Sequence, residues 1–502
     1  MSRGRLALGL IGILLLLSLG SGLAAPAPAR EPVRGGTLTL SYPSGLPHLD
    51  TNAVSQTLIV EAIGNFYERL YERDSTGKVL PHLVESEQVS SDGLTVTWKL
   101  KPNIKFHDGS PFSAEVVKWN FDRRISRRQI QYGLLPFKSI DVVDDLTVRV
   151  SLSRTSPNLH AILTMGNNAM YNPRFVQQVG DDGIRLQASG TGPFTVAEFR
   201  PNQILRLRRN PNYWQKGLPY LDEIVYRIAD DINTRATMLA AGDVDIAREV
   251  SFPDAQRFKT TSGYKVLERV GSRQYCIYIN TRRPLVSDVR VRQALNYAVD
   301  KESIIRTVLL GNGKTATVWL FGPQVAGFTP TEGYPYSPDK ARALLEEAGW
   351  RVGAGGIRQR DGQPLRITYV TRKGGSPGDF EIAELVQGMR RAIRHDQVDV
   401  DAEYVMLGFY RSVDFPPRGF NYSHYSNPQV DSLIEDSLRV RNLSGRNSIY
   451  YSQIIKQVVR DAPGILLFDI QMQAPMKNSV QGVYLDPAYN MWPVKYAWKE
   501  KP

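Results

Sequence analysis

The sequence predicts a mixed α/β fold with more than one domain. Runs in which apolar and polar residues alternate occur along the whole chain, and such runs are typical of half-buried strands. Between them lie stretches with capping residues and apolar side chains at four-residue spacing, which indicate helices. The chain has 502 residues, and single hydrophobic cores rarely organise so many, so we expect two or three domains.

The segment 92–125 gives the clearest local prediction. An Asp-Gly turn precedes residues 94–101, in which apolar and polar side chains alternate strictly, so we expect a half-buried strand there. A second turn at Asp108-Gly109 is followed by Ser113, which is in position to cap a helix. That helix has apolar residues at four-residue spacing and therefore a face that can be buried.

Further strands and helices are expected along the rest of the chain. The apolar or alternating runs that indicate strands are 36–42, 146–152, 204–207, 224–228, 275–279, 365–370 and 465–468. Four helices are expected in the second part of the chain, each beginning at a residue that can cap it, and these residues are Ser287, Asp300, Ser337 and Asn427. Glycines at 311 and 349 are expected to end the second and third of these helices. Strands and helices thus alternate, as in α/β proteins.

Residues 1–29 have the pattern of a cleaved secretory signal peptide. Arg3 and Arg5 precede an apolar run at 6–19, and Ala27-Pro28-Ala29 offers a small-residue cleavage site. The apolar run is shorter than the roughly 20 residues that a membrane span needs. No cysteine follows the run, so we expect no lipid anchor. The pattern predicts export to the periplasm as a free protein.

Charge and cysteine content restrict the classes of partner. The formal net charge is +12, but acidic residues lie among the basic ones and no nucleic-acid-binding motif is present. We therefore expect a solvated basic surface and no nucleic-acid partner, with an acidic ligand as a second possibility. Cys276 is the only cysteine, so no intramolecular disulfide can form, and its apolar neighbours indicate a small buried side chain.

Five motifs in order along the chain resemble bacterial solute-binding protein family 5, the peptide-type receptors of ABC importers. The motifs read FHDGSPF, GTGPF, RRNPNYW, DVRVRQALNYAVDK and NYSHYSNPQVDSLI, and they begin at residues 106, 190, 208, 288 and 421. The resemblance implies a two-lobed periplasmic binding protein clamp of type II-like form, with an extra domain inserted in the N-terminal lobe. It places the first lobe at 30–65, 186–275 and 478–502, the extra domain at 66–185 and the second lobe at 276–477.

The same resemblance implies a function. We expect a periplasmic receptor that captures a di- or oligopeptide, or a peptide-like solute, between two hinged lobes. Its partner would be an ABC permease in the inner membrane, and the receptor itself would be a monomer. Three alternatives remain open: a receptor for a nickel complex, an opine or a sugar; a sensory or chaperone-like peptide binder without a transporter; and a secreted hydrolase.

The hydrolase alternative depends on one motif. Residues 374–378 match G-x-S-x-G, with Ser376 in the position of the nucleophile. The next residue is Pro377, which has no backbone N–H to donate to an oxyanion. Residues 371–373 also separate the motif from the preceding strand, so the sharp bend that such enzymes need is lacking. We therefore expect no enzyme, no catalytic residue, no metal site and no cofactor.

The predicted ligand site combines aromatic residues near loops with two charges. Residues in or beside Gly- and Pro-containing segments are expected to line the cleft, namely Tyr42, Leu46, Tyr132, Phe409, Tyr410, Tyr422, Tyr425 and Trp492. They suit an extended peptide whose backbone is held by strand-like hydrogen bonds. The family resemblance adds Arg372 for the ligand carboxylate and, less directly, Asp414 for its amine. Asp414 is the nearest acid after Phe409, in a segment shorter than the family usually shows.

Overall fold

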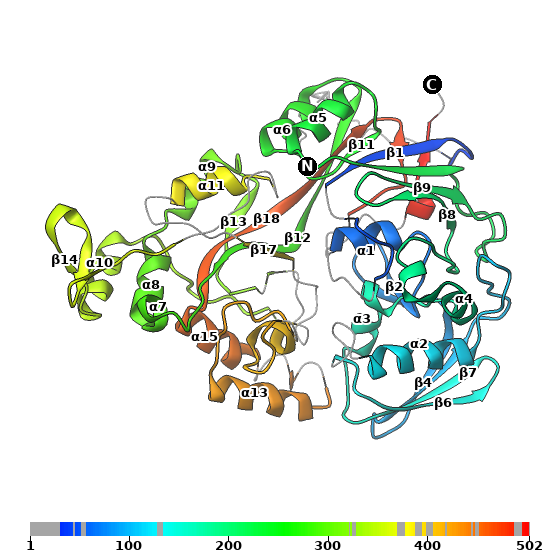
Figure 1. The fold of residues 1–502 in the computed structure, drawn as a ribbon, viewed down its shortest axis with the longest axis horizontal. Coiled ribbons are helices and arrows are strands. Elements are labelled where there is room, and N and C mark those ends of the chain that lie inside the picture. The colour runs from blue at the N-terminus through cyan, green and yellow to red at the C-terminus, as the bar shows by residue number, and fades with distance from the viewer. Residues whose placement is uncertain are drawn as a thin grey trace, which may run out of the picture.

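The computed structural model describes residues 31–43, 46–51, 57–127, 134–320, 322–323, 328–368, 377–386, 394–397, 405–416, 419–442, 445–446, 451–485 and 494–500. Strands and helices alternate along the chain, which confirms the predicted α/β class. Figure 1 shows two halves joined by two long strands, β12 and β18. We call the half that holds α1, α2 and β1 the N-terminal half and the half that holds α8, α10 and α13 the C-terminal half.

The central sheet has nine strands and spans both halves. Its order is β17-β12-β18-β11-β1-β10-β9-β8, and β13 pairs with β18 outside this path. Only β1 forms parallel pairs among these described strands, one with β10 and one with β11. The strands are β1 (Thr37–Tyr42), β8 (Phe194–Arg200), β9 (Ile204–Arg209), β10 (Glu223–Ile228), β11 (Ile246–Ala247), β12 (Tyr264–Tyr278), β13 (Gly313–Thr315), β17 (Arg394–Gln397) and β18 (Gly464–Lys477).

The antiparallel pair β12 and β18 connects the two halves. Almost every residue of β18 is buried, because helices and other strands cover both of its faces. The pairing slips once between Val270 and Gln274 and again after Tyr275, so the two strands bend where they pass between the halves. Both strands were predicted only in part, at 275–279 and 465–468, and the structure extends them to 15 and 14 residues.

A separate four-stranded sheet lies in the N-terminal half. Its order is β4-β5-β7-β6, and its strands are β4 (Val84–Val89), β5 (Thr95–Leu100), β6 (Phe137–Asp144) and β7 (Thr147–Leu152). The alternation at 94–101 buries Val96, Trp98 and Leu100, as predicted. Helix α2 (Ala114–Ser126) packs on this sheet and begins after Ser113, although the Ser113 side chain makes no capping hydrogen bond. These elements lie within the range assigned to the extra domain, whose boundaries stay a prediction.

The predicted helices of the C-terminal half are present, with two corrections. Asp288, not Ser287, caps α8 (Val289–Tyr297), because Ser287 ends the short helix α7 (Pro284–Ser287), which begins at a proline. Helix α9 (Lys301–Thr307) follows Asp300 as predicted but ends before Gly311. Three further helices of this half are α10 (Pro338–Glu347), α13 (Pro428–Arg439) and α15 (Ser452–Asp461).

The strand expected at 365–370 is wrong for the four residues 365–368 that the structure describes. Only the two-residue strand β16 (Gln363–Pro364) precedes them. Leu365 and Ile367 pack against the hydrophobic core instead. Their alternation therefore reflects packing against neighbouring side chains and not pairing in a sheet.

The shorter elements complete the fold. They are α1 (Thr57–Ile63), β2 (Tyr71–Arg73), β3 (Val79–Pro81), α3 (Leu159–Leu163), α4 (Pro173–Gly183), α5 (Ile232–Ala240), α6 (Phe252–Thr260), β14 (Arg351–Val352), β15 (Arg358–Arg360), α11 (Asp379–Val386), the π-type helix η5 (Met406–Tyr410), the 3₁₀ turns η2 (Gly166–Asn168), η3 (Ala354–Gly356) and η7 (Val494–Tyr496), and the pair β19 (Val480–Gln481) and β20 (Trp498–Lys499). Cys276 is fully buried, as predicted. Within the ranges given above, no helix is long and apolar enough to cross a membrane.

Candidate functional site

Several aromatic side chains of the C-terminal half lie together. The Tyr278 ring contacts Trp319 at 5.2 Å and Tyr422 at 5.6 Å between ring centroids, both edge-on. Phe409 stacks on Phe420 at 5.5 Å. The Tyr410 hydroxyl donates a hydrogen bond to the carbonyl of Trp319. The structure therefore brings three predicted site residues together, Phe409, Tyr410 and Tyr422.

Hydrogen bonds between the Asn421 side chain and the backbone of its neighbours hold the loop that carries Phe420 and Tyr422. Its side-chain amide donates to the carbonyls of Arg411 and Tyr425, at 3.2 and 2.8 Å, and its amide oxygen accepts from the Tyr425 N–H. Tyr425 in turn donates to the Asp461 carboxylate at 2.6 Å. The buried Tyr425 thus serves to fix the loop, and its hydroxyl is already used.

Asp414 faces an arginine of its own half. Its carboxylate lies 2.6 Å from the Nε of Arg411, and Arg411 also reaches Glu435 at 3.3 Å. Burial alone would lower the pKa of Arg411, but the hydrogen bond and charge of Asp414 outweigh burial and raise it. The Asp414 side chain is buried. A ligand amine at this position would share the carboxylate with Arg411, so the assignment of Asp414 as the amine anchor stays a prediction.

A cavity of about 430 Å³ lies between the two halves. The loop after β7, in the N-terminal half, contributes Arg154 and Thr155. The C-terminal half contributes the other lining residues, from η5, from α13 and from the segments that follow them, and these are Leu407, Arg411, Glu435, Leu438, Arg439 and Arg441. We call this cavity the arginine pocket. Figure 1 shows α13 and β7 in different halves of the molecule, so the pocket is lined from both sides.

Two predicted site residues lie elsewhere. Tyr42 and Leu46 are buried in the core of the N-terminal half, each 1% exposed. The Tyr42 ring packs edge-on against Tyr226 at 5.4 Å. Burial raises the pKa of the Tyr42 hydroxyl, and the nearby Glu61 adds to this. The structure therefore places these two in a core, while Tyr132, Arg372 and Trp492 lie outside the described residues, as does Ser376 of the hydrolase motif.

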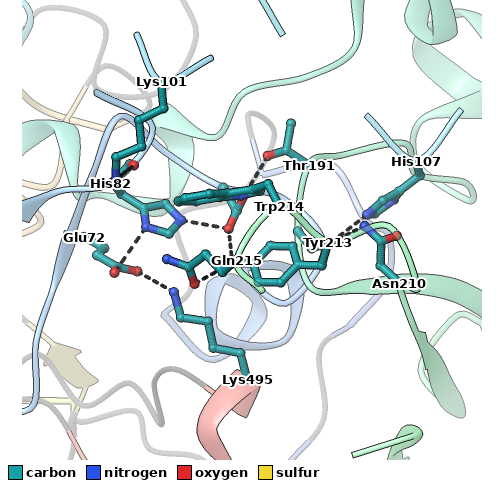
Figure 2. Close-up of polar contacts among 12 residues, drawn as sticks. Glu72, His82, Lys101, His107, Thr191, Asn210, Tyr213, Trp214, Gln215 and Lys495 are labelled. Carbon is teal, nitrogen blue, oxygen red and sulfur yellow. Dashed lines mark hydrogen bonds and ion pairs between the residues drawn. The ribbon is translucent and has the colours of Figure 1, made fainter. Parts of the chain in front are cut away.

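A second, much smaller cavity adjoins a buried ionic cluster in the N-terminal half (Figure 2). Both ring nitrogens of His82 contact carboxylates, Nε2 that of Glu68 at 2.7 Å and Nδ1 that of Glu72 at 3.1 Å. Lys495, near the C-terminus, reaches Glu72 at 3.1 Å. Glu68 also accepts hydrogen bonds from Thr191, Tyr213 and Trp214. The cavity here is about 30 Å³, enough for a water molecule and too small for a solute.

The sequence did not single out the arginines of the pocket. Arg154 and Arg441 are far apart along the chain and only the fold places them around one cavity. The spacing of Arg439 and Arg441 at the end of a helix was a signal, but it is equally typical of a solvated surface.

Comparisons with known proteins cover most of the chain. Residues 78–411 match the family described as bacterial extracellular solute-binding proteins, family 5. The glutathione-binding protein GsiB of Pectobacterium atrosepticum is 28% identical over 500 residues, which cover 93% of this chain and 95% of the relative. The protein of the same name from Salmonella typhimurium is 28% identical over 503 residues, which cover 94% and 96%.

Solved structures have the same fold. The oligopeptide-binding protein AppA from Bacillus subtilis, in complex with a nonapeptide, has a TM-score of 0.84 and 22% identity over 94% of this chain and 100% of that chain. NikZ from Campylobacter jejuni, in complex with Ni(L-His), has a TM-score of 0.83 and 19% identity over 92% and 99%. These similarities confirm the two-lobed fold. Because the match at 78–411 covers more than half of the sequence, this chain belongs to family 5 of the bacterial extracellular solute-binding proteins.

Proposed function

We propose that the protein is the receptor of an ABC importer for a small peptide-like solute, and that glutathione is the first solute to test. The observation that carries this proposal is the similarity to glutathione-binding proteins over more than nine-tenths of both chains. Proteins of family 5 work in the periplasm, which agrees with the signal-peptide pattern at 1–29.

The cavity between the halves supports the proposal. Sites for small molecules usually measure about 300–1,000 Å³, and the arginine pocket has about 430 Å³. The helix η5 contributes both to the pocket, through Leu407, and to the aromatic cluster of the C-terminal half, through Phe409. A site with polar groups from two halves can hold the charged ends of a short peptide while apolar side chains enclose its middle.

The mechanism follows from binding between hinged lobes. A solute that contacts both lobes only when they are closed shifts the equilibrium between open and closed forms. A shift from 1:99 to 99:1 requires about 5.5 kcal/mol of differential affinity. The permease would then recognise the closed receptor. The solute is released unchanged, so no residue of this protein needs to act as a nucleophile or general base.

Isothermal titration calorimetry and thermal unfolding with a defined panel test the proposal. The panel contains reduced glutathione, a neutral tripeptide, Ni(L-His)₂, an opine and a sugar. Glutathione at about 100 times its Kd should stabilise the folded protein by about 2.7 kcal/mol and raise its Tm. A response to the nickel complex, the opine or the sugar alone would replace the peptide-type solute with that class.

Recovery of the solute distinguishes a receptor from a hydrolase. Glutathione incubated with the protein and analysed by mass spectrometry should be recovered intact, and Ser376→Ala should bind it as the unmodified protein does. Cleavage of the peptide that disappears in Ser376→Ala would favour the enzyme.

A further inference from the structure

The arginine pocket carries an excess of positive charge. Four arginines and one glutamate line it, together with a threonine and two leucines. Guanidinium groups present several N–H donors in a planar fork that fits a carboxylate with two parallel hydrogen bonds. The composition of the lining thus matches an anion and not a cation or a neutral sugar.

Two of the arginines have donors to spare. Arg439 pairs with Asp436 at 2.8 Å, one turn earlier on α13, but its side chain is 78% exposed. Arg441 forms no hydrogen bond or ion pair with any residue in the described ranges. Arg411, in contrast, already holds Asp414 and Glu435. A solute would therefore meet the free N–H groups of Arg439 and Arg441 first.

Arginines line the pocket from both halves of the molecule. Arg154 stands on the N-terminal side and the other three arginines on the C-terminal side. Asp92, in the turn between β4 and β5 of the N-terminal half, is close enough to interact with Arg441: hydrogen bonds from Ser90 and Leu94 are the main reason that the Asp92 pKa is lowered, and the charge of Arg441 adds to them. An anion placed between the two sides would attract the arginines of both, so it would favour the closed arrangement.

We propose that the arginine pocket binds a carboxylate of the solute from both halves at once, so that the receptor is specific for acidic peptides. This inference rests on the proposed function and narrows it to one class of solute. Glutathione fits the class, because it has two carboxylates and one amine. The neutral tripeptide lacks the second carboxylate that would occupy the pocket.

The test uses the full mature protein and a double variant, Arg439→Gln with Arg441→Gln. Both side chains are exposed, so the variant should fold, which circular dichroism checks. Calorimetry with glutathione and with its glycine monoethyl ester gives the readout. The unmodified protein should bind glutathione at least about tenfold more tightly than the ester, and the double variant should lose that difference, since each charged hydrogen bond is worth about a factor of ten or more.

Arg342→Gln is the matched control. Arg342 is an exposed arginine of α10 that pairs with Asp339 one turn earlier, as Arg439 pairs with Asp436. Its variant should bind glutathione within about twofold of the unmodified protein. A second variant, Arg154→Gln, tests the opposite side and should also weaken glutathione binding.

The outcomes separate the two proposals. If glutathione binds the unmodified protein and the double variant equally well, the pocket does not hold the carboxylate, and the receptor function stands. If the unmodified protein prefers the neutral tripeptide, specificity for acidic peptides is wrong while a peptide receptor remains. If no peptide binds at all, both the function and the inference fail.

Discussion

Asp469 is a buried carboxyl in the strand that joins the two halves. One amide donates to it, the Nε2 of Gln274 at 3.0 Å, and Gln274 is itself fixed by the backbone of Val318 and Leu320. Burial raises the pKa of Asp469 to about 6, although the bond from Gln274 opposes the rise. A raised pKa means that the folded state binds the proton more tightly than the unfolded state does. The contribution of Asp469 to stability is therefore greatest at low pH and is lost as the pH rises through about 6.

Asp469→Asn should remove this pH dependence. The asparagine keeps the acceptor for Gln274 without the charge, so the variant should be more stable than the unmodified protein at pH 8, by up to about 3 kcal/mol. At pH 4 the two proteins should be nearly equal. Urea unfolding from pH 4 to pH 8 measures the difference, and parallel curves across that range would show that Asp469 does not titrate there.

His82 is a buried histidine that the neighbouring carboxylates hold in its charged form, whereas burial favours the neutral form of Asp469. Its two ring nitrogens both face carboxylates, so both must carry protons to donate. Burial would lower the pKa of His82, but the charges of Glu72 and Glu68 outweigh burial and raise it. The stability from this pairing is present below the ordinary histidine pKa and is lost as the pH rises through the raised value.

His82→Gln should destabilise the protein by roughly 3 kcal/mol at pH 6, because the buried Glu68 and the half-buried Glu72 lose a charged partner. The loss should shrink as the pH rises above the pKa of His82. His160→Gln is the control: His160 also contacts a glutamate, at 2.8 Å, but its side chain is 41% exposed. Exposed pairs contribute at most about 1 kcal/mol. Equal losses in the two variants would mean that burial of the ionic cluster adds nothing.

At the scale of single elements, helix α13 depends on Asn427, the residue that caps its N-terminus. The Asn427 side chain accepts from the N–H groups of Gln429 and Val430 at 2.9 and 3.3 Å, and it donates to Asp461 at 2.7 Å. These bonds satisfy N–H groups that the helix itself leaves without partners. The cap matters for function because α13 carries Arg439 into the arginine pocket.

Asn427→Ala should cost about 0.5–2 kcal/mol in the free energy of unfolding, the range measured for lost helix caps. Ser113→Ala is the control, since Ser113 stands at the same position of α2 but its side chain makes no capping bond. Chemical denaturation should show almost no loss in the serine variant. A comparable loss of stability in both variants would mean that the loss comes from replacing a polar side chain at the start of a helix and not from removing the cap hydrogen bonds.

At the scale of the whole molecule, closure and solute binding should be one event. The halves are joined through β12 and β18, and the arginine pocket takes its lining from both (Figure 1). Small-angle X-ray scattering should therefore show a smaller radius of gyration when glutathione is added. The variant with Gln at 439 and 441 should need a higher glutathione concentration for the same change. A radius that does not respond to bound glutathione would argue against hinged closure.

Local patterns predicted much of the fold. The alternation at 94–101 correctly predicts β5, and the capping residue Asn427 correctly predicts the start of α13. Both signals work because they depend on interactions between residues that are close in the sequence. Ser287 was misassigned as a cap because the competing residue is adjacent and equally able to accept a bond. The strand predicted at 365–370 is absent from the described residues 365–368. Alternation indicates which side chains are buried, but it does not specify whether a strand or other side chains bury them.

The candidate site was also predictable only in part from the sequence. Of the residues expected to line the cleft, Phe409, Tyr410 and Tyr422 lie together, while Tyr42 and Leu46 lie in a core. The family motifs and the α/β class were already determined by the amino-acid sequence, and the pattern at 1–29 predicts export, since composition, period and order are properties of the chain itself. Which arginines face one cavity was decided only by the tertiary structure, because Arg154 and Arg441 come close only when the two halves pack against each other.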